Sequence, residues 1–278
     1  MTTSQPSSGS PQGQPFAGGP GVQPFPGTPR DQLVELARHG DSVVMQDREP
    51  WRIGELDEDY RHSAVLVLFG ALDSVPAGYA EHSEGPGRDL DVLFVQRADT
   101  LRAHPGQVAF PGGRLDPPDG EIGTFVDVPG GSVSAPHVRA ALREAHEETG
   151  LDPAGVEVLG ALHPVPLPVS NHLVTPVIGW WCKESPVDVM DHAESSLVFR
   201  VPVLDLINPA HRYYATVTRG PRTYKSPAFD VQVPGVPGTV SVWGFTGVVL
   251  DRILDRLGWS VEWDRSVKRP APGVGGTT

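Results

Sequence analysis

The stretch that most constrains this chain is an acidic segment at residues 143–151. Three carboxylates, Glu144, Glu147 and Glu148, stand at positions i, i+3 and i+4, which are neighbours on one face of a helix. Gly150 suits the left-handed residue that ends a helix. The pattern therefore predicts a helix that packs one side and holds clustered negative charge on another. The packing side consists of Val138, Leu142, Ala145 and Thr149.

The acidic cluster has the composition of a site for a hard divalent cation. Adjacent carboxylates repel one another, and a bound cation would remove that repulsion. Mg²⁺ prefers oxygen ligands and usually keeps waters and substrate phosphates in its octahedral shell. Arg143 precedes the cluster and can orient one carboxylate. A solvated acidic helix face is the alternative, because acidic triplets at this spacing are common.

A glycine-rich segment with three basic side chains lies upstream, at residues 97–113. The basic side chains concentrate positive potential in an acidic protein, and the glycines permit close backbone approach and unusual backbone angles. An anion-binding loop needs both properties, but a turn with scattered charges remains an alternative for this segment alone. The basic residues are Arg97, Arg102 and His104, and the glycines are Gly106, Gly112 and Gly113.

Charge and cysteine content limit the classes of partner. A net charge of −12 and a pI near 5.2 argue against electrostatic binding to nucleic acid or an anionic membrane. A small phosphorylated substrate stays compatible, because a bound metal supplies local positive charge. Cys182 is the single cysteine, which excludes an intrachain disulfide and suits a reducing cytoplasm. No apolar run reaches the length of a membrane span, and the oligomeric state stays open, with a homodimer among the options.

Composition divides the 278 residues into one domain and two tails. Residues 1–29 are expected to be a disordered tail, since a Ser-, Gly-, Pro- and Gln-rich segment buries too little to offset its ordering entropy. Residues 30–57 are expected to form a helix and a linker. Residues 58–262 are expected to form one mixed α/β domain, and residues 263–278 a second disordered tail.

Within the domain, apolar runs of strand length alternate with two long helical patterns. One helix is the acidic one, and the other covers 244–257. Residues 120–135 are irregular and rich in Gly, Ser and Val, so no regular element is expected there. The expected strands are 63–72, 89–97, 156–165, 173–182, 196–201, 212–218, 229–233 and 240–243.

Gly113, Asp119 and the segment 143–151 together resemble a Nudix box, whose pattern is G-x5-E-x7-R-E-U-x-E-E-x-G-U. Asp119 stands in place of the first Glu of the pattern. Between Asp119 and Arg143 lie 23 residues instead of seven, so 16 residues are inserted, at about 120–136. We expect the insertion to be a surface excursion whose two ends return to the usual geometry.

The upstream segment 97–113 is similar to the signature of the coenzyme A pyrophosphatase subgroup, which also carries Asp at the position of Asp119. The resemblance covers residues 60 to 258. It implies a Nudix-type α/β/α sandwich with a mixed sheet between helices, and Mg²⁺ or Mn²⁺ as the cofactor. Later segments similar to the same subgroup are 167–170, 174–177 and 243–247.

The resemblance also implies a role for each matching residue. Glu144 and Glu148 would be the principal metal ligands, and Glu147 would be a third ligand or the base. Arg143 would hold Glu144 in position. The general base is left open between Glu144, Glu147 and Glu194. Arg97, Arg102 and His104 would contact the diphosphate or the additional 3′-phosphate of coenzyme A. Gly112 and Gly113 are also expected at the substrate, and a carbonyl of one of them would complete the metal shell.

The activity implied is hydrolysis of the diphosphate of coenzyme A to 3′,5′-ADP and 4′-phosphopantetheine, or of an acyl derivative to the acylated product. One alternative is a Nudix hydrolase of ADP-ribose or another nucleoside diphosphate derivative. An alternative of another class is a Nudix-fold binding module without catalysis. The insertion motivates that last alternative, and the retained Arg143, Glu144, Glu147 and Glu148 oppose it.

Overall fold

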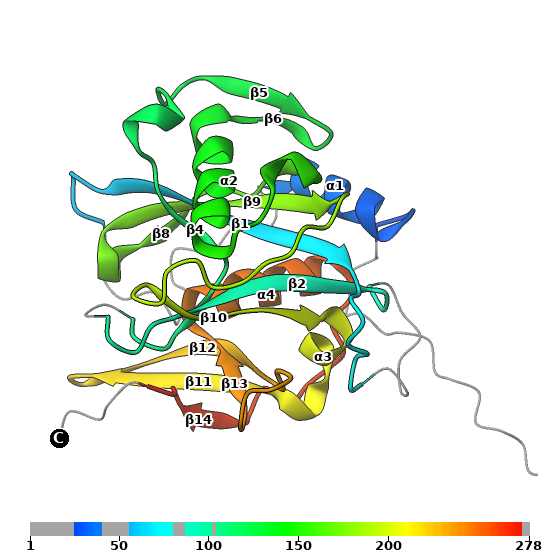
Figure 1. Cartoon of the computed structure of the whole chain (residues 1–278). Coiled ribbons are helices and arrows are strands. Elements are labelled where there is room, and N and C mark those ends of the chain that lie inside the picture. The colour runs from blue at the N-terminus through cyan, green and yellow to red at the C-terminus, as the bar shows by residue number, and fades with distance from the viewer. Residues whose placement is uncertain (1–24, 41–55, 80–86, 102–103, 274–278) are drawn as a thin grey trace, which may run out of the picture.

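A mixed β-sheet forms the centre of the molecule (Figure 1). The computed structural model describes residues 25–40, 56–79, 87–101 and 104–273. Strand β1 runs parallel to β9 and antiparallel to β2, as a mixed sheet requires. The strand order is β10 (Ser195–Pro202), β2 (Leu90–Arg97), β1 (Arg61–Ala71), β9 (His172–Trp181) and β7 (Val156–Ala161), with the short strands β3 (Val108–Ala109), β4 (Gly112–Arg114) and β8 (Val165–Leu167) at its margins.

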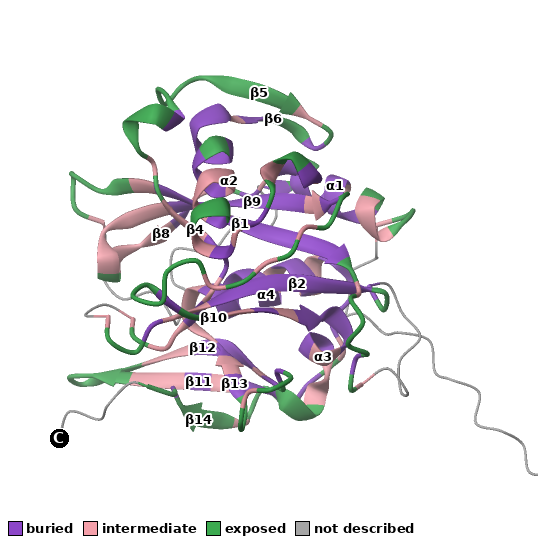
Figure 2. Ribbon diagram, viewed as in Figure 1, coloured by how far each residue is buried: buried purple, intermediate pink, exposed green. Residues whose placement is uncertain are grey.

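Helices cover both faces of this sheet because its central strand is apolar on both sides. In β1, Leu66 and Leu68 pack with helix α2 (Ala135–Thr149), whereas Val67 and Phe69 pack in the core that contains helices α1 (Pro29–Arg38) and α4 (Gly244–Leu257). Figure 2 shows the buried strands between these layers. The expected α/β/α sandwich is confirmed. None of the described helices is both long and apolar enough to cross a membrane.

A second sheet, which the sequence did not predict as a separate layer, lies beside the first (Figure 1). Helix α3 (Val203–Ile207) and a short turn lead from β10 into it. Its strands occupy or extend the expected segments 212–218, 229–233 and 240–243. Their order is β13 (Val240–Val242), β12 (Arg222–Val231), β11 (Arg212–Arg219) and β14 (Lys268–Pro270).

The expected disordered tail at 263–278 is wrong for residues 263–273. Strand β14 pairs in parallel with β11, and Trp263 and Ala271 are buried. The buried Arg212, paired with Asp251, lies over the Trp263 ring at 4.7 Å from its centroid. This cation–π and aromatic packing offsets the ordering cost that the Gly/Pro composition suggested. Residues 274–278 lie outside the described residues.

The expected tail at 1–29 is also wrong at its C-terminal end. Phe25 stacks on His39 with ring centroids 5.6 Å apart, and the Arg256 guanidinium lies 4.6 Å from the Phe25 ring centroid. Thr28 and Asp31 form a capping box at the start of α1, which the sequence predicts from residue 31. Residues 1–24 and most of the expected linker, 41–55, lie outside the described residues.

The insertion forms a β-hairpin where an irregular segment was expected. Strand β5 (Phe125–Val128) pairs antiparallel with β6 (Gly131–Ser134). The outer strand β5 is largely exposed, as expected for a surface excursion (Figure 2). The turn is docked, however: Gly130 N–H donates to the Leu159 carbonyl at 2.7 Å, and Arg38 Nη2 donates to the Pro129 carbonyl at 3.0 Å. The insertion therefore pairs with itself as a hairpin, and its turn is hydrogen-bonded to β7 and α1. The expected strand 156–165 is divided into β7 and β8.

A buried histidine in the first turn of α2 makes stability depend on pH. His137 shares a 2.7 Å hydrogen bond with Ser134 Oγ, and burial, with a smaller effect of the nearby His62, lowers its pKa to about 4. An unfolded histidine takes up its proton near pH 6.5, so protonation favours unfolding between about pH 6.5 and 4. We expect His137 to make its full contribution to the free energy of unfolding above pH 6.5. As the pH falls toward 4, that free energy should decrease by about 3 kcal/mol.

The measurement is urea unfolding of the wild type and of His137→Gln across this pH range. The variant should lose the part of the pH dependence that His137 contributes. Parallel curves for the two proteins would contradict the assignment.

Candidate active site

Helix α2 presents its carboxylates to the glycine turn because its other side is buried. Ala145 and Thr149 are fully buried against the sheet. The helix ends at Gly150, whose φ of 72° is left-handed and whose N–H donates to the His146 carbonyl at 2.8 Å. The helix and its end are thus as the sequence predicts. Glu144 and Glu148 consequently project toward strand β4.

The Gly112–Gly113 turn lies in close contact with two glutamates of helix α2. Gly112 N–H donates to Glu148 Oε2 at 3.0 Å. A Cβ atom added to Gly113 would lie 2.4 Å from the Glu144 carboxyl carbon, so no larger residue fits while Glu144 keeps this position. Pairing of Gly113 with Ala64 of β1 fixes the turn. The structure therefore brings together Gly112, Gly113, Glu144 and Glu148, despite the insertion between the two motifs.

Arg143 holds three carboxylates at once. Its guanidinium donates to both Asp119 oxygens at 3.1 and 2.9 Å, to Glu144 Oε1 at 3.0 Å and to Glu147 Oε2 at 3.0 Å. Asp119 is buried, which alone would raise its pKa, but the hydrogen bonds and charge of Arg143 hold that pKa below its usual value. The link from Arg143 to Asp119 joins the two halves of the Nudix-like pattern across the insertion.

Glu147 differs from the other two glutamates of the cluster. Its side chain is 54% exposed, against 19% for Glu144, and it forms an ion pair with Arg143. Among the described residues, no three His, Cys, Asp or Glu side chains are arranged to hold a metal ion. Glu144 and Glu148 therefore lie together against the glycine turn, whereas Glu147 lies at the exposed edge of the site.

The donor pair fits a divalent cation on electrostatic grounds. The pKa of Glu148 is raised to about 7, mainly because the carboxyl group is buried. The hydrogen bond from Gly112 lowers this pKa, whereas the charges of Glu144 and Glu194 raise it. Burial also raises the pKa of Glu144. Two buried carboxylates that are costly to ionise together are stabilised by a cation between them. A pair of carboxylates plus waters and substrate oxygens matches the preference of Mg²⁺ or Mn²⁺.

Two further predicted residues lie near this pair. Glu194 is exposed immediately before β10, and its carbonyl accepts a 2.9 Å hydrogen bond from Ala98 N–H. Arg97, at the end of β2, lowers the pKa of Glu148 through its charge. Its Nε atom is buried and has no hydrogen-bond partner among the described residues, which suits a group that awaits an anion.

His104 lies in the glycine-rich loop, whereas Arg102 lies outside the described residues. The backbone of His104 is left-handed, with φ of 55°, and its Nδ1 shares a 2.9 Å hydrogen bond with Gln107 Oε1. Burial lowers its pKa; the Gln107 bond opposes this, and the charges of Arg97 and Arg219 lower it further. Arg97 and Arg219 therefore both lie close enough to His104 for their charges to act on it, and they form a positive region beside it.

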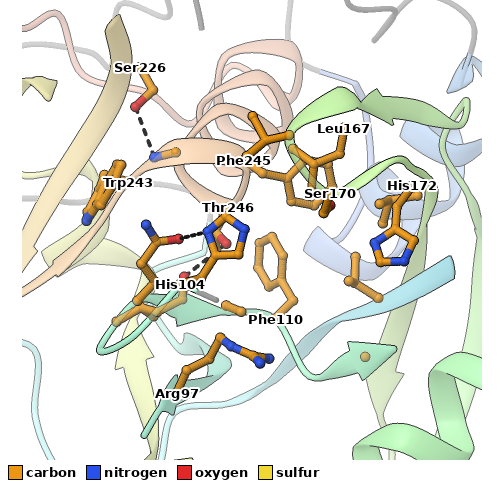
Figure 3. A pocket seen from close by; sticks show the side chains of 18 of the residues that line it. Arg97, His104, Phe110, Leu167, Ser170, His172, Ser226, Trp243, Phe245 and Thr246 are labelled. Carbon is orange, nitrogen blue, oxygen red and sulfur yellow. Dashed lines mark hydrogen bonds between the residues drawn. The ribbon is translucent and has the colours of Figure 1, made fainter. Parts of the chain in front are cut away.

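A cavity of about 400 Å³ lies between the two sheets, beside the glycine turn (Figure 3). Figure 3 shows Arg97 and His104 on one side of Phe110, and Ser170 and His172 on the other. No Asp or Glu is among the described residues that line it, although the protein is acidic overall. Its walls come from β1, β3, β4 and β8, from β11 and β12 of the second sheet, and from the first turn of α4.

Sequence reasoning missed the wall that the second sheet contributes. Arg219 and Tyr224 line the cavity, but the sequence analysis did not single out the basic segment 219–225 to which both belong. Trp243, which opens the segment 243–247 noted above, lines the cavity as well. His172, which a loop position made unremarkable, also lines the cavity, and its Nε2 has no partner among the described residues. These positions become visible only when strands distant in sequence are brought together.

Comparison with known proteins agrees with this geometry. A family model for the NUDIX domain matches residues 79–213. Nudix hydrolase 3 of Caenorhabditis elegans is 34% identical over 182 residues, covering 62% of this chain and 68% of the relative. An uncharacterized Nudix hydrolase NudL of Yersinia enterocolitica is 30% identical over 172 residues, covering 60% of this chain and 73% of the relative.

Other matches cover less. An uncharacterized NudL of Enterobacter sp. is 39% identical over 127 residues, but the match spans only 54% of that relative and 45% of this chain. The crystal structure of a NUDIX hydrolase from Alicyclobacillus acidocaldarius covers 54% of this chain and 82% of its own, at 21% identity and a TM-score of 0.36, which is too low to support an argument. The longer sequence matches are sufficient, and they establish that this chain belongs to the Nudix hydrolase family of pyrophosphohydrolases.

Proposed function

We propose that this protein cleaves the diphosphate of coenzyme A or its acyl derivatives, giving 3′,5′-ADP and 4′-phosphopantetheine or its acylated form. The observation that carries the proposal is the position of Glu144 and Glu148 against Gly112–Gly113, beside a cavity whose described lining residues include basic but no acidic side chains. The negative pair suits a cation, and the positive cavity suits the anionic substrate around it. The choice of coenzyme A rests on the similarity of segment 97–113 to that subgroup.

Each side chain has a task in this proposal. Arg97 and the glycine-turn backbone bind the diphosphate, and Arg143 keeps Glu144 oriented through their 3.0 Å hydrogen bond. Mg²⁺ or Mn²⁺ held by Glu144 and Glu148 would neutralise diphosphate charge and lower the pKa of a bound water. Glu147 would assist in holding the metal from the edge of the site, because its side chain is exposed and paired with Arg143.

Glu194 is the general base that this arrangement favours. Arg143 donates to both Glu144 and Glu147, so both carboxylates are already engaged in hydrogen bonds, and Glu144 is also assigned to the metal. Glu194 is exposed to water and close enough for its charge to raise the pKa of Glu148. Removal of a proton from the attacking water by Glu194 would contribute about 10²–10⁴-fold to the rate.

Two substitutions separate metal binding from proton transfer. Glu148→Gln keeps an acceptor for Gly112 N–H but removes a ligand charge, so we expect turnover to fall about 100-fold or more, with a weaker apparent metal affinity and an unchanged melting temperature. Glu194→Gln should lower kcat while the apparent metal affinity stays the same. Steady-state kinetics across Mg²⁺ concentrations measures both, with the exposed Glu121→Gln as the control. Unchanged turnover in Glu148→Gln would contradict the metal role.

Substitution of the two neighbouring glycines should have different consequences. In Gly113→Ala, the new Cβ meets the movable Glu144 carboxylate, so we expect activity to fall about tenfold or more with a small change in stability. In Gly112→Ala, the new Cβ would lie 2.3 Å from the Ala64 carbonyl oxygen, a backbone atom, so we expect unfolding to become easier by about 2 kcal/mol or more. Kinetics and urea unfolding of both variants test this. Equal losses of stability would contradict it.

A substrate panel tests the function itself. We expect coenzyme A to be preferred over ADP-ribose, NADH and dinucleoside polyphosphates, with products identified by mass spectrometry. Turnover should disappear after chelation with EDTA and return with Mg²⁺ or Mn²⁺, because the paired carboxylates would lose their cation. A preference for ADP-ribose would overturn the choice of substrate. Absence of turnover on the whole panel with metal present would favour a binding module.

A further inference from the structure

The hairpin of β11 and β12 forms a wall of the cavity. Register pairs Val217 with Tyr224 and Ala215 with Ser226, so these four side chains lie on one face of the hairpin. All four line the cavity, and so does Arg219, two residues beyond Val217 on the same face. The family model ends at residue 213, so almost the whole hairpin lies beyond the matched region.

Arg219 is the cation of this wall that faces the cavity. Lys225 also borders the cavity, but it pairs with Thr216 on the opposite face, and its Nζ lies 4.5 Å from the Tyr214 ring centroid. No ion pair of Arg219 occurs among the described residues, even though acidic residues outnumber basic ones in the chain, 34 to 22. An unpaired arginine at a cavity without carboxylates is available to an anion.

Arg219 also belongs to the same positive region as Arg97, and this region lies beside His104 of the glycine-rich loop. Its charge and that of Arg97 both lower the pKa of His104. Arg97 also acts on Glu148 at the carboxylate pair, so it lies toward the site of the diphosphate. The basic lining of the cavity therefore extends from Arg97, near the carboxylate pair, to Arg219 on the hairpin.

We propose that Arg219, together with His104, determines specificity by binding a second anionic group of the substrate, a phosphate monoester separate from the diphosphate. The guanidinium presents a planar set of N–H donors that matches phosphate oxygens. This inference rests on the proposed function, because the substrate must carry both a diphosphate and a further phosphate. The β11–β12 hairpin, which lies almost wholly beyond the residues matched by the family model, thus determines which diphosphate substrate binds. The residues of helix α2 and of the glycine turn form the site of cleavage.

The test compares coenzyme A with dephospho-coenzyme A, which differ only in that phosphate monoester. Arg219→Ala should lower kcat/KM for coenzyme A about tenfold, mainly through KM, and leave kcat/KM for dephospho-coenzyme A unchanged. Arg222→Ala is the matched control, because Arg222 is the cross-strand partner of Arg219 and does not line the cavity. It should leave both values unchanged. Arg219 is exposed, so its variant should fold, which circular dichroism checks.

The outcomes separate this inference from the function on which it rests. Cleavage of neither substrate by the wild type would overturn the proposed function and the inference together. Cleavage of coenzyme A by the wild type, with the same substrate preference in Arg219→Ala, would overturn the role of Arg219 alone. Equal losses on both substrates would also overturn it, because Arg219 would then act on the diphosphate or on the fold. Partial recovery in Arg219→Lys, for coenzyme A only, would support it.

Discussion

The structure depends on one close contact, that of the Gly112–Gly113 turn with the carboxylates of helix α2. The backbone is fixed on both sides of the contact: β1 holds the turn through strand pairing, and the buried Ala145 fixes the rotation of the helix. Glycine is required because any Cβ on Gly113 would occupy the position of Glu144. The sandwich therefore positions two carboxylates that would otherwise repel each other, and the cost of burying them creates the affinity for a cation.

The insertion leaves this contact intact because its own polar backbone groups are satisfied locally. The β5–β6 pairing closes the added residues into a hairpin, and the bonds of its turn to β7 and α1 prevent it from lying over the site. Arg143 then restores the connection that the insertion interrupts, since it binds Asp119 on one side and Glu144 on the other. The insertion therefore adds a hairpin to the surface and leaves the geometry of the active site unchanged.

The sequence predicted correctly those elements whose positions depend on interactions between residues close in sequence. The apolar stripe and Gly150 located α2, and α4 begins and ends at the residues that the sequence indicates, 244 and 257. The glycines and acids that meet were also identified. The hairpin, the strand β14 and the second wall of the cavity were not, because each depends on pairing or packing between segments distant in sequence. Trp263 shows why: its burial against Arg212 outweighs a Gly/Pro composition that resembles a disordered tail.

An acidic protein thus combines a negative pair with a positive cavity, and we propose that Glu144 and Glu148 bind the cation between them. Anomalous diffraction from crystals grown with Mn²⁺ would locate the cation. We expect a peak bonded to carboxylate oxygens of both residues, next to the Gly112–Gly113 turn. A peak bonded to other residues, or an empty site at saturating Mn²⁺, would contradict it.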